Sequence, residues 1–127
     1  HDISLLRKAI RSNLFDTVMI EFSVFFTETL WLIKEAFDRG LGIIAMRPLG
    51  GSGRTTSIET AGKTARPFIL SVAQLLTYTL SNKNLAVAIV GSSHPQRVLD
   101  NVETAVSYVD LNEKQMEAYE IKASLLY

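Results

Sequence analysis

The feature that most constrains the fold of this chain is the alternation of short apolar runs with stretches of helical periodicity. Three short runs predict strands: residues 15–22 are β-prone with few breakers, and residues 41–46 and 86–90 are apolar and too short for helices. Helical stretches separate them, so successive strands need crossover connections and form a parallel sheet. Because strands that are apolar throughout are covered on both sides, we expect both faces of the sheet to be covered. The pattern predicts an α/β fold with about three parallel strands and flanking helices.

Helix-capping signals accompany this alternation. Asp2 can cap a first helix, Thr27 a second, and Asn112 forms a capping box with Gln115 at the last. Gly40 stands where a glycine commonly ends a helix. The inward faces are expected to be Ile3, Leu6 and Ile10; Leu30, Ile33 and Phe37; Leu75, Leu76 and Leu80; Val98, Leu99, Val102, Ala105 and Val106; and Met116, Tyr119 and Ala123.

Composition excludes several classes of function. The formal net charge is zero, so nothing indicates binding to nucleic acid or to an anionic membrane. There is no cysteine, and His1 and His94 are the only histidines, so we expect neither disulfides nor a metal site. No apolar run is long enough to span a membrane, and we expect the cytoplasm as compartment. The chain lacks an initiator methionine, and we expect it to be a segment of a longer protein.

In parallel α/β folds, ligands bind at the C-terminal ends of the strands. The stretches 22–24, 47–54 and 91–97 are predicted to lie there. The second is glycine-rich, which lets backbone approach a ligand closely, although its spacing matches no dinucleotide or Walker motif. Its basic residues, Arg47 among them, either pair with phosphates or belong to a solvated face. Residues 50–67 are expected to form a long flexible loop.

The third of these stretches carries the most informative pattern. A glycine and two serines run from a strand into the start of a helix, where free N–H groups and the helix dipole attract an anion. Arg97 in the first turn can fork onto a phosphate, and Asp100 and Asn101 follow one turn later. The expected N-cap of this helix is Ser93 or His94. The alternative to an anion site is that Ser92 and Ser93 only cap the helix and Arg97 is a solvated surface residue. We assign His94 no role as a general base.

Glu21 lies within the first predicted strand, among apolar neighbours. Two interpretations remain open for it. A buried carboxylate is costly unless it is paired, so a paired structural acid is as consistent with the sequence as a functional one.

Four longer motifs and one short one, taken in order, point to a known family. They are residues 15–23 (FDTVMIEFS), 40–51 (GLGIIAMRPLGG), 71–76 (SVAQLL), 88–101 (AIVGSSHPQRVLDN) and 110–113 (DLNE). Together they resemble the aldo-keto reductases, which fold as an eight-stranded β/α barrel and reduce carbonyl compounds with NADPH. The resemblance implies that residues 1–127 form the C-terminal half of such a (β/α)8 barrel, from its sixth to its eighth strand.

The resemblance also implies a set of cofactor-binding residues. They are Met46 against the nicotinamide, Leu49 and Gly51 beside the pyrophosphate, Ser92 at a phosphate, Arg97 at the 2′-phosphate of NADP, and Asp100 and Asn101 at the adenine. Met19 stands where the family often has a glutamine, and Phe22 and Ser23 where it has Tyr-Asn. Gly91 stands where some members place a lysine for the 2′-phosphate, so NAD remains an alternative to NADP.

The function implied for the full-length parent is NADP(H)-dependent reduction of small aldehydes or ketones. The family's catalytic Asp, Tyr, Lys and His come from the first half of the barrel, so we expect no catalytic residue here and no activity of this segment alone. The alternative is a nucleotide-binding regulatory or structural half-barrel without catalysis. An unclosed half-barrel exposes strand edges and an apolar surface, so we expect it to pair with the missing N-terminal half or to self-associate.

Overall fold

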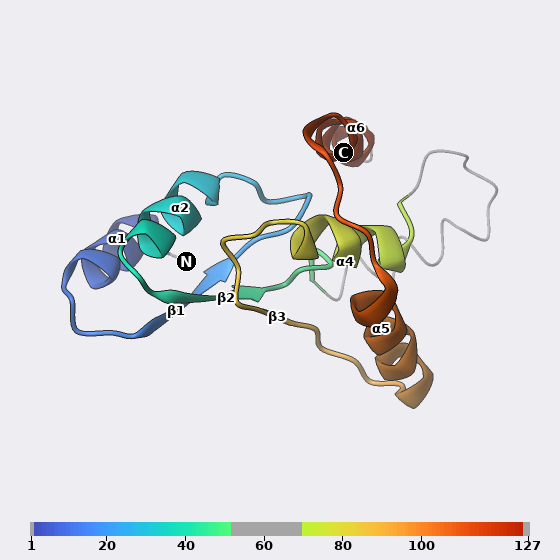
Figure 1. Cartoon of the computed structure of the whole chain (residues 1–127), viewed down its shortest axis with the longest axis horizontal. Helices are drawn as coiled ribbons and strands as arrows, with labels where there is room; N and C mark the ends of the chain where they lie inside the picture. Colours follow the sequence, from blue (N-terminus) through green and yellow to red (C-terminus); the bar gives the residue numbers. More distant parts are fainter. Residues whose placement is uncertain (1, 52–69, 126–127) are drawn as a thin grey trace.

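The computed structural model describes residues 2–51 and 70–125 (Figure 1). Its elements in chain order are α1 (Ile3–Arg11), β1 (Thr17–Glu21), α2 (Leu30–Asp38), β2 (Gly42–Met46), α4 (Val72–Leu80), β3 (Val87–Ile89), α5 (Pro95–Ser107) and α6 (Glu113–Ser124). The loop expected over residues 50–67 lies almost entirely outside the described residues. Among the described residues, no helix combines the length and apolarity needed to cross a membrane.

The three strands form one parallel sheet in the order β1-β2-β3. Val18 pairs with Ile43 in the first ladder, and Met46 pairs with Ile89 in the second. The predicted α/β class with three parallel strands is therefore confirmed. Because the strands are parallel and in register, β2 and β3 end at the same edge of the sheet, where ligands bind in folds of this kind.

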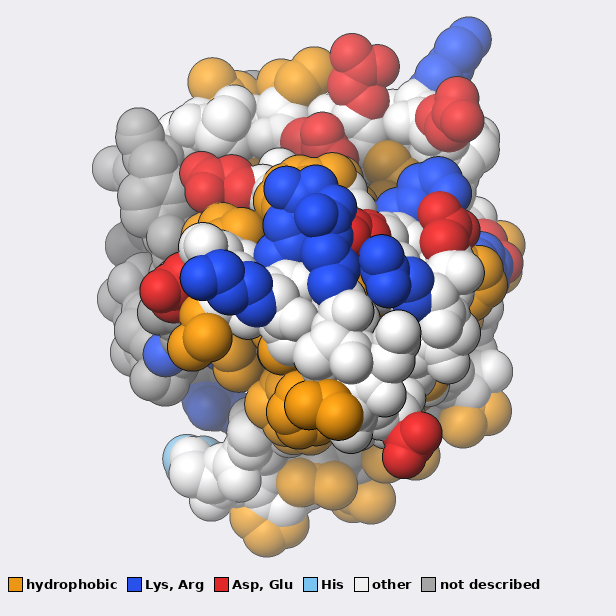
Figure 2. Space-filling model, turned by 90° about the vertical axis from the view of Figure 1, so that its left-hand side faces the viewer, with side chains coloured by type: hydrophobic (Ala, Val, Ile, Leu, Met, Phe, Trp, Pro, Cys, Tyr) orange, Lys and Arg blue, Asp and Glu red, His pale blue; other side chains and the backbone are white. Residues whose placement is uncertain are grey.

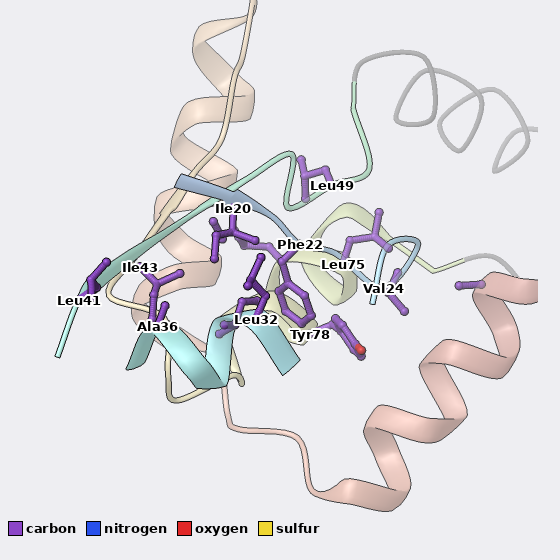
Figure 3. Packing of buried hydrophobic residues seen from close by; sticks show 14 of the residues in the cluster. Ile20, Phe22, Val24, Leu32, Ala36, Leu41, Ile43, Leu49, Leu75 and Tyr78 are labelled. Atoms are coloured by element: carbon purple, nitrogen blue, oxygen red, sulfur yellow. The ribbon is translucent and has the colours of Figure 1, made fainter. Parts of the chain in front are cut away.

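The hydrophobic core lies on one side of the sheet. Ile20, Ile43 and Ala45 are buried there against residues of α2 and α4, including Leu32 and Leu75 (Figure 3). Side chains alternate between the two faces of a strand, so the neighbouring residues point the other way. The core therefore joins the sheet to a single layer of helices.

The opposite face of the sheet is open in the described part of the chain. Met19 of β1 and Val87 and Ile89 of β3 are about half exposed there. The expectation that both faces are covered is therefore wrong for residues 2–51 and 70–125. β3, which the sequence indicates as a buried strand, is the last strand of the sheet and pairs only with β2. An apolar run indicates that a strand suits a buried position. It does not indicate whether residues of the same chain pack over that strand.

Most of the capping signals are confirmed. Asp2 accepts a hydrogen bond from the Leu5 backbone N–H (3.0 Å), and Asn112 and Gln115 form the capping box of α6. Gly40 follows α2 with a φ of +80°, a left-handed conformation that favours glycine. The expected cap at Thr27 is wrong. The N-cap residue of α2 is Thr29, whose hydroxyl donates to the Glu21 carbonyl (2.7 Å) and so ties the helix start to β1.

The inward faces of α1, α4 and α6 are broadly as predicted, whereas those of α2 and α5 differ. α2 buries Leu32, Ile33 and Ala36, and it leaves Leu30 and Phe37 exposed. α5 buries no residue at all, although five were expected to point inward. α5 packs chiefly against α4, beyond the last strand (Figure 1). Val98, Val102 and Ala105 border a groove against α4, and Leu99 and Val106 are exposed.

The outer face of α1 and α2 is held together by charges. Glu35 of α2 pairs with Arg7 and Arg11 of α1, and Arg39 lies 3.8 Å from the same carboxylate. The hydrogen bond from Arg11, together with the nearby guanidiniums, holds the pKa of Glu35 below its usual range. Figure 2 shows Lys and Arg side chains gathered on this side of the molecule. The cluster fastens α1 to α2, far from the strand ends where a site is expected.

Candidate functional site

A cavity of about 700 Å³ lies at the C-terminal ends of β2 and β3. Its size is within the range of small-molecule and cofactor sites. The residues lining it come from the turn after β2, the start of α4, the end of β3 with the segment after it, and α5. They are Arg47, Pro48, Leu49, Gly51, Ser71, Val72, Ala73, Ile89, Val90, Gly91, Ser92, Ser93, Arg97, Asp100, Asn101 and Thr104.

Six of the seven residues expected to bind a cofactor line this one cavity. They are Leu49, Gly51, Ser92, Arg97, Asp100 and Asn101. Met46, the seventh, is not among the lining residues. It is the last residue of β2 and is partly buried, and its neighbour Arg47 lines the cavity instead. Residues separated by more than fifty positions in the sequence are thus brought together by the parallel register of β2 and β3.

The N-terminus of α5 opens onto this cavity without a side-chain cap. Pro95 occupies the first turn, and the N-cap residue His94 makes no capping hydrogen bond. Ser92 donates to the His94 carbonyl (3.1 Å), and Ser93 lies 2.9 Å from His94 Nδ1. The expectation that the N-cap is Ser93 or His94 is confirmed for His94, although its side chain makes no capping hydrogen bond. The alternative in which Ser92 and Ser93 cap the helix is wrong, because neither is the N-cap residue and both hydroxyls hydrogen-bond to His94. Uncapped N–H groups and the helix dipole together favour an anion at this point.

Polar side chains of α5 continue the wall of the cavity. Arg97 lies in the first turn, and Asp100, Asn101 and Thr104 follow at helical spacing. Gln96 donates to the Asp100 carboxylate (2.9 Å), and the Thr104 hydroxyl donates to the Asp100 carbonyl (2.9 Å). The wall thus offers a guanidinium, a carboxylate and an amide, which suit a phosphate and the donor and acceptor edges of a base.

Arg47, which the sequence left open between pairing with a phosphate and lying on a solvated face, lines the cavity. It follows β2 directly, and its Nη1 atom lies 3.4 Å from Oε2 of Glu21 at the end of β1. Its backbone has a φ of +54°, in the left-handed region. The structure resolves the two interpretations of Glu21 in favour of an ion-paired acid that is largely buried. Its position directly after a strand is the signal that could have separated Arg47 from the other basic residues of the stretch.

The lining residues suit the binding of an anionic ligand. In the described part of the chain, no three His, Cys, Asp or Glu side chains gather in a way that could hold a metal ion. Two guanidiniums and a helix N-terminus face one cavity, beside apolar residues such as Leu49 and Val90. This combination fits an elongated ligand with anionic groups and a flat apolar part.

Comparisons with known proteins agree with this architecture. No protein-family model and no curated protein matches the sequence. Among solved structures, the aldo-keto reductase AKR11C1 from Bacillus halodurans matches in its holo and apo forms, each with 12% identity and a TM-score of 0.68. The matches cover 93% of this chain and 46% and 47% of the reductase chains, so the chain spans about half of their length. The likeness confirms the sequence resemblance at the level of the fold: the chain folds as part of an aldo-keto reductase barrel.

Proposed function

We propose that the cavity at the strand ends binds NADP(H), with NAD(H) as the alternative cofactor. We further propose that residues 1–127 are the C-terminal half of a cytoplasmic barrel enzyme that reduces aldehydes or ketones. The observation that carries the proposal is the convergence of six cofactor-binding residues, expected from sequence alone, on one cavity.

The chemistry of the cavity supports this assignment. Arg97 can fork onto the 2′-phosphate, and Ser92 and the uncapped start of α5 suit a second phosphate. Asp100 and Asn101 offer an acceptor and an amide to the adenine. Leu49 supplies apolar contact, and Gly51, with a φ of +90°, leaves the backbone accessible.

This chain would bind and orient the cofactor rather than complete the reaction. NADPH supplies a hydride when bound, and reduction of a carbonyl also needs a proton donor beside the carbonyl oxygen. The residues that would hold and deliver that proton are expected in the other half of the barrel. The full-length parent is thus proposed as the enzyme, and the substrate is proposed as a small carbonyl compound.

A second candidate function is a nucleotide-binding regulatory or structural barrel without catalysis. Met46 favours it, because the residue expected to stack on the nicotinamide is a thioether and does not line the cavity. Met19, in place of the family's usual glutamine, lies on the same open face. Activity of the parent protein with a panel of aldehydes separates the two, since only the first candidate predicts turnover of NADPH.

The proposal is tested by titrating NADPH fluorescence with the chain and with Arg97→Met. We expect the wild type to bind and the variant to bind roughly tenfold or more weakly, because a charged hydrogen-bonding group is lost. Arg39→Met, on the outer face of α2, is the matched control and should bind as the wild type does. Absence of NADPH and NADH binding by the wild type would overturn the proposal.

We also propose that this half-barrel completes its sheet by pairing, either with the other half of the barrel or with a second copy. The open sheet face and the unpaired outer edges of β1 and β3 in the described part of the chain support this. The same exposed residues would line the interior of a closed barrel.

A further inference from the structure

The outer face of α1 and α2 carries a group of arginines that the nucleotide cavity does not use. Arg7 and Arg11 of α1 and Arg39 of α2 approach the Glu35 carboxylate through their Nε atoms, at 3.2, 2.5 and 3.8 Å. We call these three arginines the arginine cluster. In the described part of the chain, no second carboxylate lies within ion-pair distance of any of them. Three positive charges therefore share one negative charge.

The contacts with Glu35 use only one side of each guanidinium. The hydrogen bonds from Arg7 and Arg11 come from Nε, and among the described residues neither arginine donates from its Nη atoms. The side chains of the cluster are 45%, 48% and 38% exposed, so their outer ends are accessible to solvent. Each guanidinium has five N–H donors in a planar fork that suits a carboxylate. The cluster thus presents Nη donors to the outside while Glu35 holds it from within.

Trp31 lies directly beside the arginine cluster. It belongs to α2, one helical turn before Glu35, and the Arg7 guanidinium lies over its ring, 5.2 Å from the centroid. The side chain is about half exposed, although tryptophan is on average a well-buried residue. Tryptophan and arginine are the residues that most often dominate the binding energy of protein–protein interfaces. An exposed indole next to arginines with unused donors suits contact with another protein.

Holding α1 to α2 does not account for the whole cluster. Exposed ion pairs stabilise a protein little, and a third guanidinium near one carboxylate adds repulsion between like charges. A second carboxylate brought by a partner would relieve that repulsion. The composition of the cluster is therefore better explained by an incoming anionic group than by the contact between the two helices.

Charge and position indicate what kind of partner fits. The formal net charge of the chain is zero, so the excess of positive charge is local, and Figure 2 shows it gathered on this face. A nucleic acid needs a basic surface that extends well beyond one cluster. A short peptide segment with a few carboxylates and an apolar side chain matches both the arginines and Trp31. This face belongs to the helix layer, whereas pairing of the barrel halves is proposed through the open sheet face.

We infer that the arginine cluster and Trp31 form a docking site for an acidic segment of a partner protein. Carboxylates of that segment pair with the outward Nη groups, and a neighbouring apolar side chain packs on the indole ring. Glu35 is the positioning residue, because it fixes the guanidiniums by their Nε atoms. The site lies outside the nucleotide cavity, so it does not depend on cofactor binding.

The fluorescence of Trp31 tests the inference, because Trp31 is the only tryptophan of the chain. The probe is a capped hexapeptide of four glutamates followed by leucine and phenylalanine, and the same peptide with lysines in place of the glutamates is the control. We expect the acidic peptide to shift the emission to shorter wavelength in a saturable way, because an apolar side chain displaces water from the ring. The lysine peptide should leave the emission unchanged.

Variants of Arg39 test the role of the cluster, since its contact with Glu35 is the longest and the fold depends on it least. By calorimetric titration we expect Arg39→Met to weaken binding of the acidic peptide about threefold to tenfold. Arg39→Lys keeps the charge without the planar fork and should restore part of the loss. Lys34→Met is the matched control, because Lys34 is paired with Asp38 on the same helix, and it should bind as the wild type does.

Four outcomes would overturn the inference. They are the absence of a saturable shift with the acidic peptide, equal weakening by Arg39→Met and Lys34→Met, tighter binding of inorganic tripolyphosphate than of the peptide, and a change of oligomeric mass in Arg39→Met without peptide binding. The third makes this a phosphate site, and the fourth makes a second copy of the chain the occupant. NADPH affinity should be the same in all these variants, so failure of this inference and failure of the proposed function are distinguishable.

Discussion

At the scale of single residues, Tyr78 joins three parts of the core. Its ring stacks on Phe22 after β1 (centroids 5.8 Å apart), and its hydroxyl donates to Oε1 of Glu120 on α6 (2.6 Å). Burial raises the pKa of the Tyr78 phenol, and the hydrogen bond to the Glu120 carboxylate raises it further. The folded state therefore holds this tyrosine in its neutral form.

We predict that Tyr78→Phe lowers the free energy of unfolding by about 1–3 kcal/mol at neutral pH, because a hydrogen bond to a charged group is lost. The raised pKa also sets the pH dependence. The contribution of the neutral phenol is complete below the unfolded pKa of about 10 and declines as pH rises above it. Urea unfolding between neutral and strongly alkaline pH should show the wild type losing stability faster than the variant above about pH 10. Curves that stay parallel throughout would contradict this prediction.

The neighbouring residues Met46 and Arg47 show how far sequence can define a site. Motif position relative to strand ends was enough to predict Arg97 and Asn101 as lining residues, and both line the cavity. It did not predict that Arg47 rather than Met46 lines the cavity. The two residues are neighbours at the end of β2, and side chains of neighbouring residues in a strand point to opposite faces. The left-handed φ at Arg47 runs against the local pattern, because a residue before a proline is expected to be extended with a negative φ.

At the scale of elements, α6 depends on its first turn. Asn112 and Gln115 satisfy each other's backbone N–H groups, and the helix then carries Ala123 and Glu120 to the core. We predict that Asn112→Ala lowers the free energy of unfolding by about 0.5–2 kcal/mol. Chemical denaturation measures it, with Lys114→Ala in the same turn as the control. Equal stability of the two variants would show that α6 is held by packing alone.

The elements differ in how well periodicity predicted their surroundings. α1, α4 and α6 pack as expected, because their apolar stripes meet the core of this chain. α5 has an equally clear stripe, yet Val98 and Val106 remain exposed. Periodicity identifies the apolar face of a helix. Whether that face is buried depends on which other elements pack against it. The same reason explains why β3 is exposed despite its buried-strand sequence.

At the scale of the whole molecule, the open sheet face predicts association. Met19, Val87 and Ile89 expose apolar surface beside two strand edges that are unpaired in the described part of the chain. Light scattering during size-exclusion chromatography should give masses above the 14.1 kDa of one chain, rising with concentration. Val87→Lys should shift the population toward the monomer, whereas Ala118→Lys on exposed α6 should not. A monomer at every concentration would argue against pairing through this face.

The attachment of α5 has a consequence for any molecule that enters the cavity. This helix supplies one whole wall but buries no side chain, and its main neighbour is α4 rather than the sheet. Elements held by so few buried contacts open locally at little cost. A nucleotide that contacts both the C-terminal ends of the strands and α5 would stabilise the position of this helix. Part of the binding free energy of the nucleotide would then be spent on ordering α5, which lowers the observed affinity. A partner that orders α5 beforehand would raise the affinity for the nucleotide without contacting it.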